Sequence, residues 1–461
     1  MKNIHINFKV LEKGAIFFLL YMLIFSCEPL EVDSPNHLLS GESVFTETKT
    51  VEAAMLSLYA DLRDKVLLTG MPNGMSNILG NYTDEITYVS SFGLGDEHFF
   101  KNNLTPNDAS ISEIWNNSYN VIYGANAIVE GVAESEYFTQ EEREVFTGEA
   151  LFVRAMVHFY LLNLYGEIPY VTTTNYIENK SVSKNTEKEV YNFVIADLLK
   201  AYDFLPVTDA SGEHLRPNKY VAAALLARCY FYTQQWTLTE QYATEVIENN
   251  GWEPEIQNVF KKASLSTLWQ FSPDTNGLPT NEAQTFIVSF TPPSARVLNS
   301  DLVDGFENGD LRREHWVGEI SDGTQTFYFP FKYKIGLGEN NTDEYSIVLR
   351  MAEQYLIRAE ARANLNNIPG SQSDLNKIRL RAGLVETLAS SKSELLTACL
   401  KERKVELFTE HGHRFFDLKR TESLDNVLSS KPGWNSTDKL FPLPEKELLL
   451  NPNLLPQNPG Y

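Results

Sequence analysis

Residues 149–169 read EALFVRAMVHFYLLNLYGEIP and carry the clearest secondary-structure signal in the chain. Their apolar side chains recur at the three- and four-residue spacing that gathers side chains on one wide helical stripe. Gly166 ends this pattern and Pro169 follows three residues later, the usual order at the end of a helix. The pattern predicts a long core helix over residues 141–165. Its stripe consists of Leu151, Phe152, Ala155, Met156, Phe159 and Leu162.

Helical periodicity dominates the chain on both sides of this helix. Helix pairs at 219–249 and 347–380 each span roughly the length of a tetratricopeptide repeat. The stretch 70–107 is polar and punctuated by glycine, and 252–346 favours long loops with a few short strands. We predict an all-α chain whose tetratricopeptide-like helix pairs form one curved domain with a loop-rich region. Helices are expected at 51–66, 111–132, 187–204, 219–232, 238–249 and 347–365, and capping boxes at Ser371 and Ser391 should open two more.

The charge and the cysteine count exclude several classes of protein. The chain has 461 residues and a formal net charge of −22, which argues against a nucleic-acid partner because phosphates would be repelled. Three cysteines are too few for a disulfide framework, and their spacing fits no zinc site. Cys229 and Cys399 sit in apolar helical sequence, which favours two buried free thiols, although a disulfide between them stays open.

The first 26 residues have the pattern of an export signal. Lysines precede an unbroken apolar run at 15–25, which is too short to span a membrane. Ser26 and Cys27 follow, an arrangement that resembles a bacterial lipobox, in which cleavage leaves the cysteine for lipidation. We predict a lipoprotein signal peptide at 1–26 and a lipid-anchored tether at 27–48. A plain secretory signal beside an unrelated cysteine is the alternative.

Glu402, Glu406 and Glu410 are spaced four residues apart, which places them on one helical face. Carboxylates with nearby histidines can form a metal or acid–base site, but the arginines and lysines interleaved here favour structural ion pairs. The chain also lacks the motifs of zinc proteases, serine hydrolases, phosphate-binding loops and dinucleotide-binding folds. We expect no catalytic residue, no metal and no cofactor.

Several stretches together resemble the SusD/RagB family. The segment 149–169 is similar to the signature helix of that family, and further similar stretches follow in the family's order. They read RMAEQYLIRAEA at 350–361, NKIRLRAG at 376–383, HRFFDLKR at 413–420, FPLPE at 441–445 and QNPGY at 457–461. The resemblance implies one SusD-like domain at 49–461, with an N-terminal family half at about 49–215 and a C-terminal half at about 280–461.

This resemblance also implies a place and a partner. Proteins of the family are surface lipoproteins of the outer membrane of Bacteroidota-type bacteria. They act as a lid on a TonB-dependent transporter of the SusC type and capture glycans for import, or peptides in some members. Their fold is all-α, with tetratricopeptide-like helix pairs that support a loop-rich binding face. Ligand contacts tend to come from the loop after the first helices and from loops in the middle segment.

Two stretches in those regions have the residue types of a sugar site. Sugars stack their C–H faces on aromatic rings, while their hydroxyl groups bond to carboxylate, amide or guanidinium groups beside the ring. Residues 81–92 and 310–316 combine these types. Asp310 and Arg312 match a common family pattern, so a structural role is equally expected for them. The predicted ligand-binding residues are Tyr82, Asp84, Tyr88, Phe92, Arg313 and Trp316.

The sequence therefore favours a protein that binds an oligosaccharide or polysaccharide at the cell surface, breaks no bond, and delivers the glycan to a SusC-type transporter. Three alternatives stay open. The same module could capture peptides, in which case sheet edges or carboxylate-binding arginines should form the site. A surface glycoside hydrolase would need two carboxyl groups about 5–10 Å apart in a cleft. A scaffold without any small ligand would need only the helix pairs.

Overall fold

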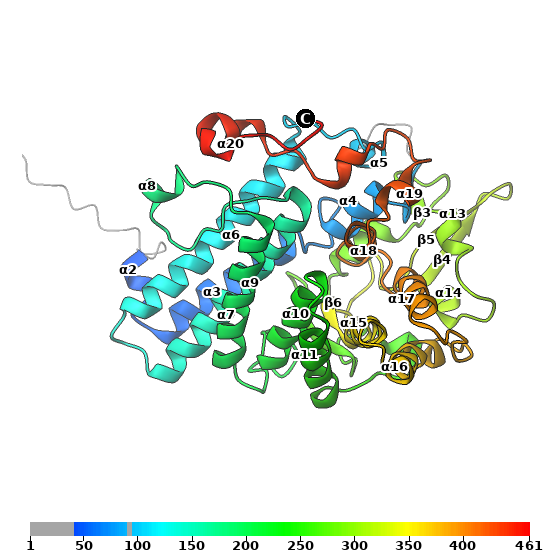
Figure 1. The fold of residues 1–461 in the computed structure, drawn as a ribbon, viewed down its shortest axis with the longest axis horizontal. Coiled ribbons are helices and arrows are strands. Elements are labelled where there is room, and N and C mark those ends of the chain that lie inside the picture. The colour runs from blue at the N-terminus through cyan, green and yellow to red at the C-terminus, as the bar shows by residue number, and fades with distance from the viewer. Residues whose placement is uncertain (1–40, 90–94) are drawn as a thin grey trace, which may run out of the picture. The chain divides into compact units, whose positions relative to one another are not determined.

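The computed structural model describes residues 41–89 and 95–461. The chain divides into two compact units, 1–44 and 45–461. In the first unit only the short helix α2 (Gly41–Val44) is described. The predicted signal peptide, Cys27 and most of the predicted tether therefore lie outside the described residues, as does Phe92. Figure 1 shows the fold of the second unit, which carries all the other described elements.

Helix α7 (Gln140–Tyr165) lies where the sequence predicted and packs against two other long helices, α6 (Ala109–Glu134) and α9 (Glu187–Phe204). Helix α3 (Thr48–Asp64) packs against both α6 and α7. A capping box begins α7, in which the hydroxyl of Thr139 accepts a hydrogen bond from the backbone N–H of Glu142. These four helices form the N-terminal part of the unit (Figure 1).

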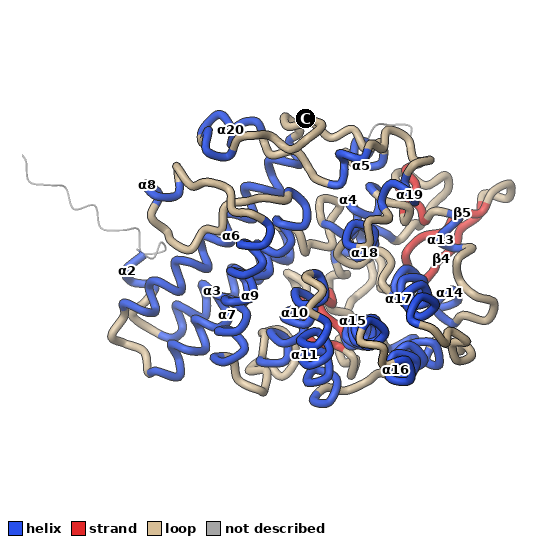
Figure 2. The backbone as a smooth tube through the Cα atoms, in the orientation of Figure 1, coloured by secondary structure: helices blue, strands red, loops and turns tan. Residues whose placement is uncertain are grey.

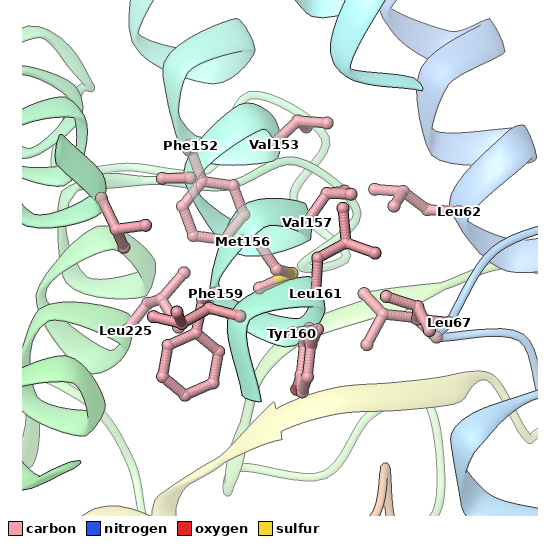
Figure 3. Close-up of a cluster of buried hydrophobic side chains, with 14 of the residues drawn as sticks. Leu62, Leu67, Phe152, Val153, Met156, Val157, Phe159, Tyr160, Leu161 and Leu225 are labelled. Atoms are coloured by element: carbon pink, nitrogen blue, oxygen red, sulfur yellow. The ribbon is translucent and has the colours of Figure 1, made fainter. Parts of the chain in front are cut away.

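From Gly148 to its end, helix α7 is buried on all of its sides rather than along one stripe. Figure 3 shows Leu62 of α3 and Leu225 of α10 (Lys219–Tyr232) on opposite sides of the α7 side chains. By length and mean hydropathy α7 could cross a membrane, but 89% of its most apolar window is buried inside the protein. Such burial is typical of a core helix. Gly166 ends the helix with a φ of 75°, in the left-handed region that favours glycine.

Two further helix pairs continue the fold. Helix α10 (Lys219–Tyr232) pairs with α11 (Trp236–Asn249), and α15 (Met351–Asn364) pairs with α16 (Ile368–Arg381). Helix α11 packs against α15, which joins the two pairs, and α17 (Lys392–Glu406) packs against α15 and α16. The helix pairs predicted from the sequence are thus confirmed, and so is the all-α class.

The second pair differs from its prediction at two points. Residues 347–349 belong to strand β6 (Ser346–Arg350), so the helix begins four residues later than predicted. The capping box predicted at Ser371 is wrong, because α16 is capped by Asn367, and the Ser371 hydroxyl donates to the carbonyl oxygen of Ala359 at 2.7 Å instead. The box predicted at Ser391 is confirmed at the start of α17.

In the part of the chain that the structure describes, three antiparallel ribbons of two strands each accompany the helices (Figure 2). Strand β1 (Ile86–Tyr88) pairs with β3 (Arg296–Leu298), which places Tyr88 opposite Arg296. Strand β2 (Thr267–Phe271) pairs with β6, and β4 (Val317–Ser321) forms a hairpin with β5 (Thr326–Pro330). Because β3 also lies against β5, the β1–β3 ribbon and the β4–β5 hairpin adjoin each other. The strands predicted within 252–346 are confirmed.

The remaining elements are short and connect these parts. They are α4 (Met75–Tyr82), α5 (Glu97–Phe100), α8 (Tyr176–Asn179), α12 (Asn281–Phe286), α13 (Ser300–Val303), α14 (Leu311–Trp316), α18 (His413–Arg420), α19 (Leu424–Leu428), α20 (Glu445–Leu450) and the 3₁₀ turns η1 (Ile256–Asn258), η2 (Ser436–Lys439) and η3 (Pro452–Leu454). The C-terminal tail docks on the end of α7, where the side-chain amide of Asn458 donates to the carbonyl oxygens of Tyr165 and Phe441, both at 2.7 Å.

Cys229 and Cys399 are buried free thiols, which confirms the prediction for both. Cys229 lies on α10 and Cys399 lies on α17. Burial raises the pKa of each thiol above its ordinary value, so both stay protonated at neutral pH. These cysteines therefore behave as small apolar core residues.

Candidate functional site

Aromatic side chains gather around the β1–β3 ribbon. Tyr88 at the end of β1 is partly exposed, and its ring centroid lies 6.3 Å from that of Phe100 on α5. The ammonium group of Lys431 lies 4.5 Å from the centre of the Phe100 ring. Phe290, which is 57% exposed, belongs to the loop that leads into β3. The backbone N–H of Val89 donates to Ala295, so this loop and the end of β1 are tied together.

Residues around this ribbon include buried polar atoms that have no hydrogen-bond partner in the described part of the chain. Arg296 donates from Nη2 to the carboxylate of Asp96 at 2.5 Å and from Nη1 to the carbonyl oxygen of Thr285 at 3.0 Å. The Nε atom of Arg296, Oγ1 of Thr285 and Nε2 of His98 are buried and have no hydrogen-bond partner within residues 41–89 and 95–461. Leaving a buried polar atom unpaired costs about 1–3 kcal/mol. Such atoms therefore mark places where water or a ligand hydroxyl group can bond.

Arg313 adds a second aromatic contact next to this ribbon. Its guanidinium carbon lies 4.8 Å from the ring centre of Tyr328 on β5, and its Nη2 lies 3.4 Å from the carboxylate of Glu319 on β4. Both Arg313 and Tyr328 are partly exposed. Because β5 lies against β3, the Arg313–Tyr328 pair and the ring of Tyr88 belong to adjoining ribbons. Arg313 and Tyr88 therefore stay predicted ligand-binding residues.

The structure contradicts ligand stacking by Trp316. The side chain is 1% exposed, its indole N–H donates to the carbonyl oxygen of Ile256 at 3.3 Å, and Phe260 packs edge-on against its ring at 5.3 Å. A ring enclosed in this way has no face for a sugar, so the prediction for Trp316 was wrong. Three cationic groups lie 5.2–5.9 Å from the ring centre, from Lys332, Arg350 and Arg381.

Tyr82 and Asp84 also have partners inside the protein, and their predicted ligand contacts are corrected. Tyr82 is fully buried and its hydroxyl donates to the carbonyl oxygen of Asp438 at 3.0 Å. Asp84 accepts two hydrogen bonds from Arg414, at 2.7 and 2.8 Å, and one from Lys404 at 3.0 Å. Burial raises the pKa of Asp84, but Arg414 and Lys404 outweigh it and hold the pKa below its ordinary value. These side chains are occupied by the fold.

The three glutamates predicted on one helical face form a buried ion network, which confirms the structural interpretation. Glu406 receives ion pairs from three arginines at 2.5–3.1 Å, and Glu410 pairs with Arg350 at 2.7 Å and with Lys332. Within residues 41–89 and 95–461, no group of three or more histidine, cysteine, aspartate or glutamate side chains could hold a metal ion. The members of this buried ion network include Asp310, Arg312, Lys332, Arg350, Arg379, Arg381, Glu402, Glu406 and Glu410.

A small cavity of about 20 Å³ adjoins the ion network and has room for about one water molecule. Lys332 and Glu282 both line it. The carboxylate of Glu282 accepts a hydrogen bond from the hydroxyl of Ser346 at 2.6 Å. Burial raises the pKa of Glu282 from 4.5 to about 7, while the Ser346 hydrogen bond lowers it by less.

This raised pKa predicts a pH-dependent loss of stability. The folded protein holds the Glu282 proton more tightly than the unfolded chain does, so this contribution is full below about pH 4.5 and is lost as pH rises through about 7. We expect the stability of the wild type, relative to Glu282→Gln, to fall by about 1–3 kcal/mol between pH 5.5 and pH 8. Urea unfolding of both proteins across this range measures the difference. Parallel pH profiles would contradict it.

Sequence reasoning missed Asp96, Phe290 and Arg296. Arg296 belongs to no stretch with aromatic neighbours of the kind used to choose candidates, and Asp96 lies between Phe92 and Phe99 but outside the chosen stretch 81–92. Their relevance depends on the pairing of β1 with β3, which joins segments about 200 residues apart in the chain. Phe290 stands before two prolines in a loop, and its exposure follows from packing and not from any sequence period. Phe92 lies outside the described residues.

Two family models match the chain. Residues 42–231 match a model described as "Starch-binding associating with outer membrane", and residues 318–461 match the model of the SusD family. Together the two matches cover well over half of the sequence. The chain belongs to the SusD/RagB family. The SusD-like family is a family of carbohydrate-binding proteins, as the sequence predicted.

Known SusD-like proteins are similar to the chain along nearly its whole length. SusD-like protein P2 of Formosa agariphila is 28% identical over an alignment of 518 positions. The alignment covers 96% of this chain and 99% of that protein. A solved structure named laminarin-binding SusD-like protein has a TM-score of 0.76 and 22% identity, with 90% of this chain and 100% of that chain covered. Surface glycan-binding protein A of Bacteroides thetaiotaomicron has a TM-score of 0.76 and 17% identity, covering 91% and 100%. The two structures share the SusD fold with this chain.

Proposed function

We propose that this SusD/RagB protein captures an oligosaccharide through the surface formed by the β1–β3 ribbon and the β4–β5 hairpin. The observation that carries the proposal is the pair of aromatic rings, Tyr88 and Phe100, with Tyr88 paired opposite Arg296 in the ribbon. Aromatic rings take the C–H faces of a sugar, and polar side chains beside them take its hydroxyl groups. Arg296 is paired with Asp96, so the pair brings no net charge and suits a neutral ligand.

We further propose that the protein is held at the cell surface by a lipid on Cys27 and delivers the glycan to a SusC-type TonB-dependent transporter. Family membership and the Ser26–Cys27 sequence support this part of the proposal. Purification of the tagged full-length protein from solubilised membranes should recover a TonB-dependent barrel and an N-terminal lipid. Recovery of the protein alone, with an unmodified cysteine, would count against it.

The glycan proposal predicts a loss of affinity on removal of either ring. We expect Tyr88→Ala and Phe100→Ala each to weaken glycan binding by about 1–2 kcal/mol, or roughly five- to thirtyfold. A titration calorimetry screen of the protein lacking its signal and lipid cysteine should identify the ligand. The screen should include laminarin, starch-derived oligosaccharides and peptide pools.

Tyr123→Ala is the matched control. Tyr123 is 54% exposed on α6, away from the ribbons, and its removal should leave glycan affinity unchanged. If Tyr88→Ala kept full affinity, or Tyr123→Ala lost as much, the site would lie elsewhere. Binding of peptides without any glycan would favour the peptide-capture alternative. Hydrolysis of a bound glycan would establish the glycosidase alternative.

A further inference from the structure

A second cavity, of about 240 Å³, lies between α3, α7 and the loop 205–218. Helices α3 and α7 lie at the opposite end of the unit 45–461 from β4 and β5 (Figure 1). Helix α7 lines the cavity with Glu142, Val145, Phe146 and Glu149, whose spacing of three, four and seven residues places them on one helical face. The volume is below that of a drug-sized site, so it suits one small group.

The floor of this cavity is a closed and neutral set of hydrogen bonds. Glu149 is 2% exposed and accepts from Nε and Nη2 of Arg216 at 3.0 and 2.7 Å. The hydroxyl of Tyr59 donates to the same carboxylate at 2.5 Å. The charge of Arg216 is therefore matched by Glu149 beneath the cavity, and Glu52 at the rim lies 3.9 Å from Nη1 of the same arginine. An anionic ligand finds no unmatched positive charge there.

Apolar walls rise from this floor to a rim of three carboxylates. Pro206 and Pro217 of the loop face Val145 and Phe146 of α7 across the cavity. The rim carboxylates are those of Glu52, Glu141 and Glu142. Glu142 accepts from the backbone N–H and hydroxyl of Thr139 and from the hydroxyl of Thr48, which lowers its pKa and keeps it ionised. The lining holds four carboxylates and one guanidinium, an excess of three negative charges.

We infer that this cavity binds an alkyl chain that ends in a positive charge, either the side chain of a lysine on a partner polypeptide or a free aliphatic amine. The apolar walls would surround the methylene groups, and the rim carboxylates would pair with the ammonium group. A bare metal ion fits less well, since no suitable group of ligands exists within residues 41–89 and 95–461. The inference concerns a site distinct from the proposed glycan surface and does not rest on it.

The test compares a charged probe with a neutral probe of the same shape. Titration calorimetry with Nα-acetyl-lysine methylamide and with Nα-acetyl-norleucine methylamide should show at least about tenfold preference for the lysine probe. Cadaverine serves as the free amine. Binding of cadaverine alone would assign the site to free amines, whereas binding of the lysine probe would assign it to a partner side chain. Equal affinity for the lysine and norleucine probes, or no binding of any amine, would overturn the inference.

Two substitutions on the rim test the electrostatic part. The double variant Glu52→Gln/Glu141→Gln should weaken binding of the lysine probe by about five- to tenfold, because each exposed charge contributes modestly to the affinity. Both side chains lie on the solvent side of the cavity, and the cap formed by Glu142 is left intact. Glu248→Gln, an exposed position on α11, is the control and should change nothing. Unchanged urea midpoints would show that the variants fold, and unchanged glycan affinity would separate this site from the glycan surface. An equal loss of affinity for the lysine probe in the double variant and in Glu248→Gln would contradict the inference.

Discussion

Replacing Glu406 with glutamine is expected to lower the free energy of unfolding by about 3–5 kcal/mol. The carboxylate is fully buried and pairs with Arg312, Arg350 and Arg381 at 3.1, 2.5 and 2.5 Å. Removing its charge leaves Arg381 without an ion-pair partner among the described residues, whereas Arg312 keeps Asp310 and Glu402 and Arg350 keeps Glu410. Burial raises the pKa of Glu406, but the three arginines hold it well below its ordinary value, so the carboxylate is ionised at neutral pH.

The measurement is urea unfolding followed by circular dichroism at neutral pH. Glu386→Gln makes the same chemical change at an exposed loop position and should shift the midpoint little. If Glu406→Gln and the Glu386→Gln control had the same urea midpoint, the ion network would make no net contribution to the free energy of unfolding. The expected difference arises because breaking a buried ion pair from one side costs more than the pair contributes when it is intact.

The sequence predicted the helical framework well because helix formation depends on residues that are neighbours in the chain. The helix predicted at 187–204 is α9 with the same bounds, and the helix predicted at 219–232 is α10. Helix α4 (Met75–Tyr82) was not predicted, because it lies in a stretch that reads as polar and rich in glycine. All eight of its residues are buried, so it shows no alternation between an apolar and a polar face.

The candidate site was harder to predict, since exposure of an aromatic residue depends on segments far away in the chain. Tyr82 ends the buried helix α4 and packs against Phe441, which comes from the C-terminal tail. Tyr88 lies only six residues later and stays partly exposed beside Phe100. The amino-acid composition of residues 81–92 does not show which of these two tyrosine rings is buried. Only the pairing of β1 with β3 separates a ring that packs in the core from one that faces the surface.

Trp316→Ala is the second large effect we predict, and it separates two interpretations of this residue. Loss of a buried tryptophan leaves a cavity, so the free energy of unfolding should fall by about 3–5 kcal/mol. The variant also loses the indole hydrogen bond to Ile256 and the ring that contacts Lys332, Arg350 and Arg381. Replacing a tryptophan that stacks on a ligand at the surface would instead weaken ligand binding and leave the free energy of unfolding nearly unchanged.

Trp316→Phe tests binding in a protein that keeps most of its core. This variant fills much of the cavity, so we expect a smaller loss of stability and a glycan affinity within about twofold of the wild type. Trp236→Ala, at a partly exposed position on α11, provides the reference for removal of a tryptophan outside the core. A Trp316→Phe protein with wild-type stability but no glycan binding would restore the stacking role. The burial of the ring among three cationic groups argues for the opposite result, because a sugar could reach it only if the ion network around Glu406 came apart.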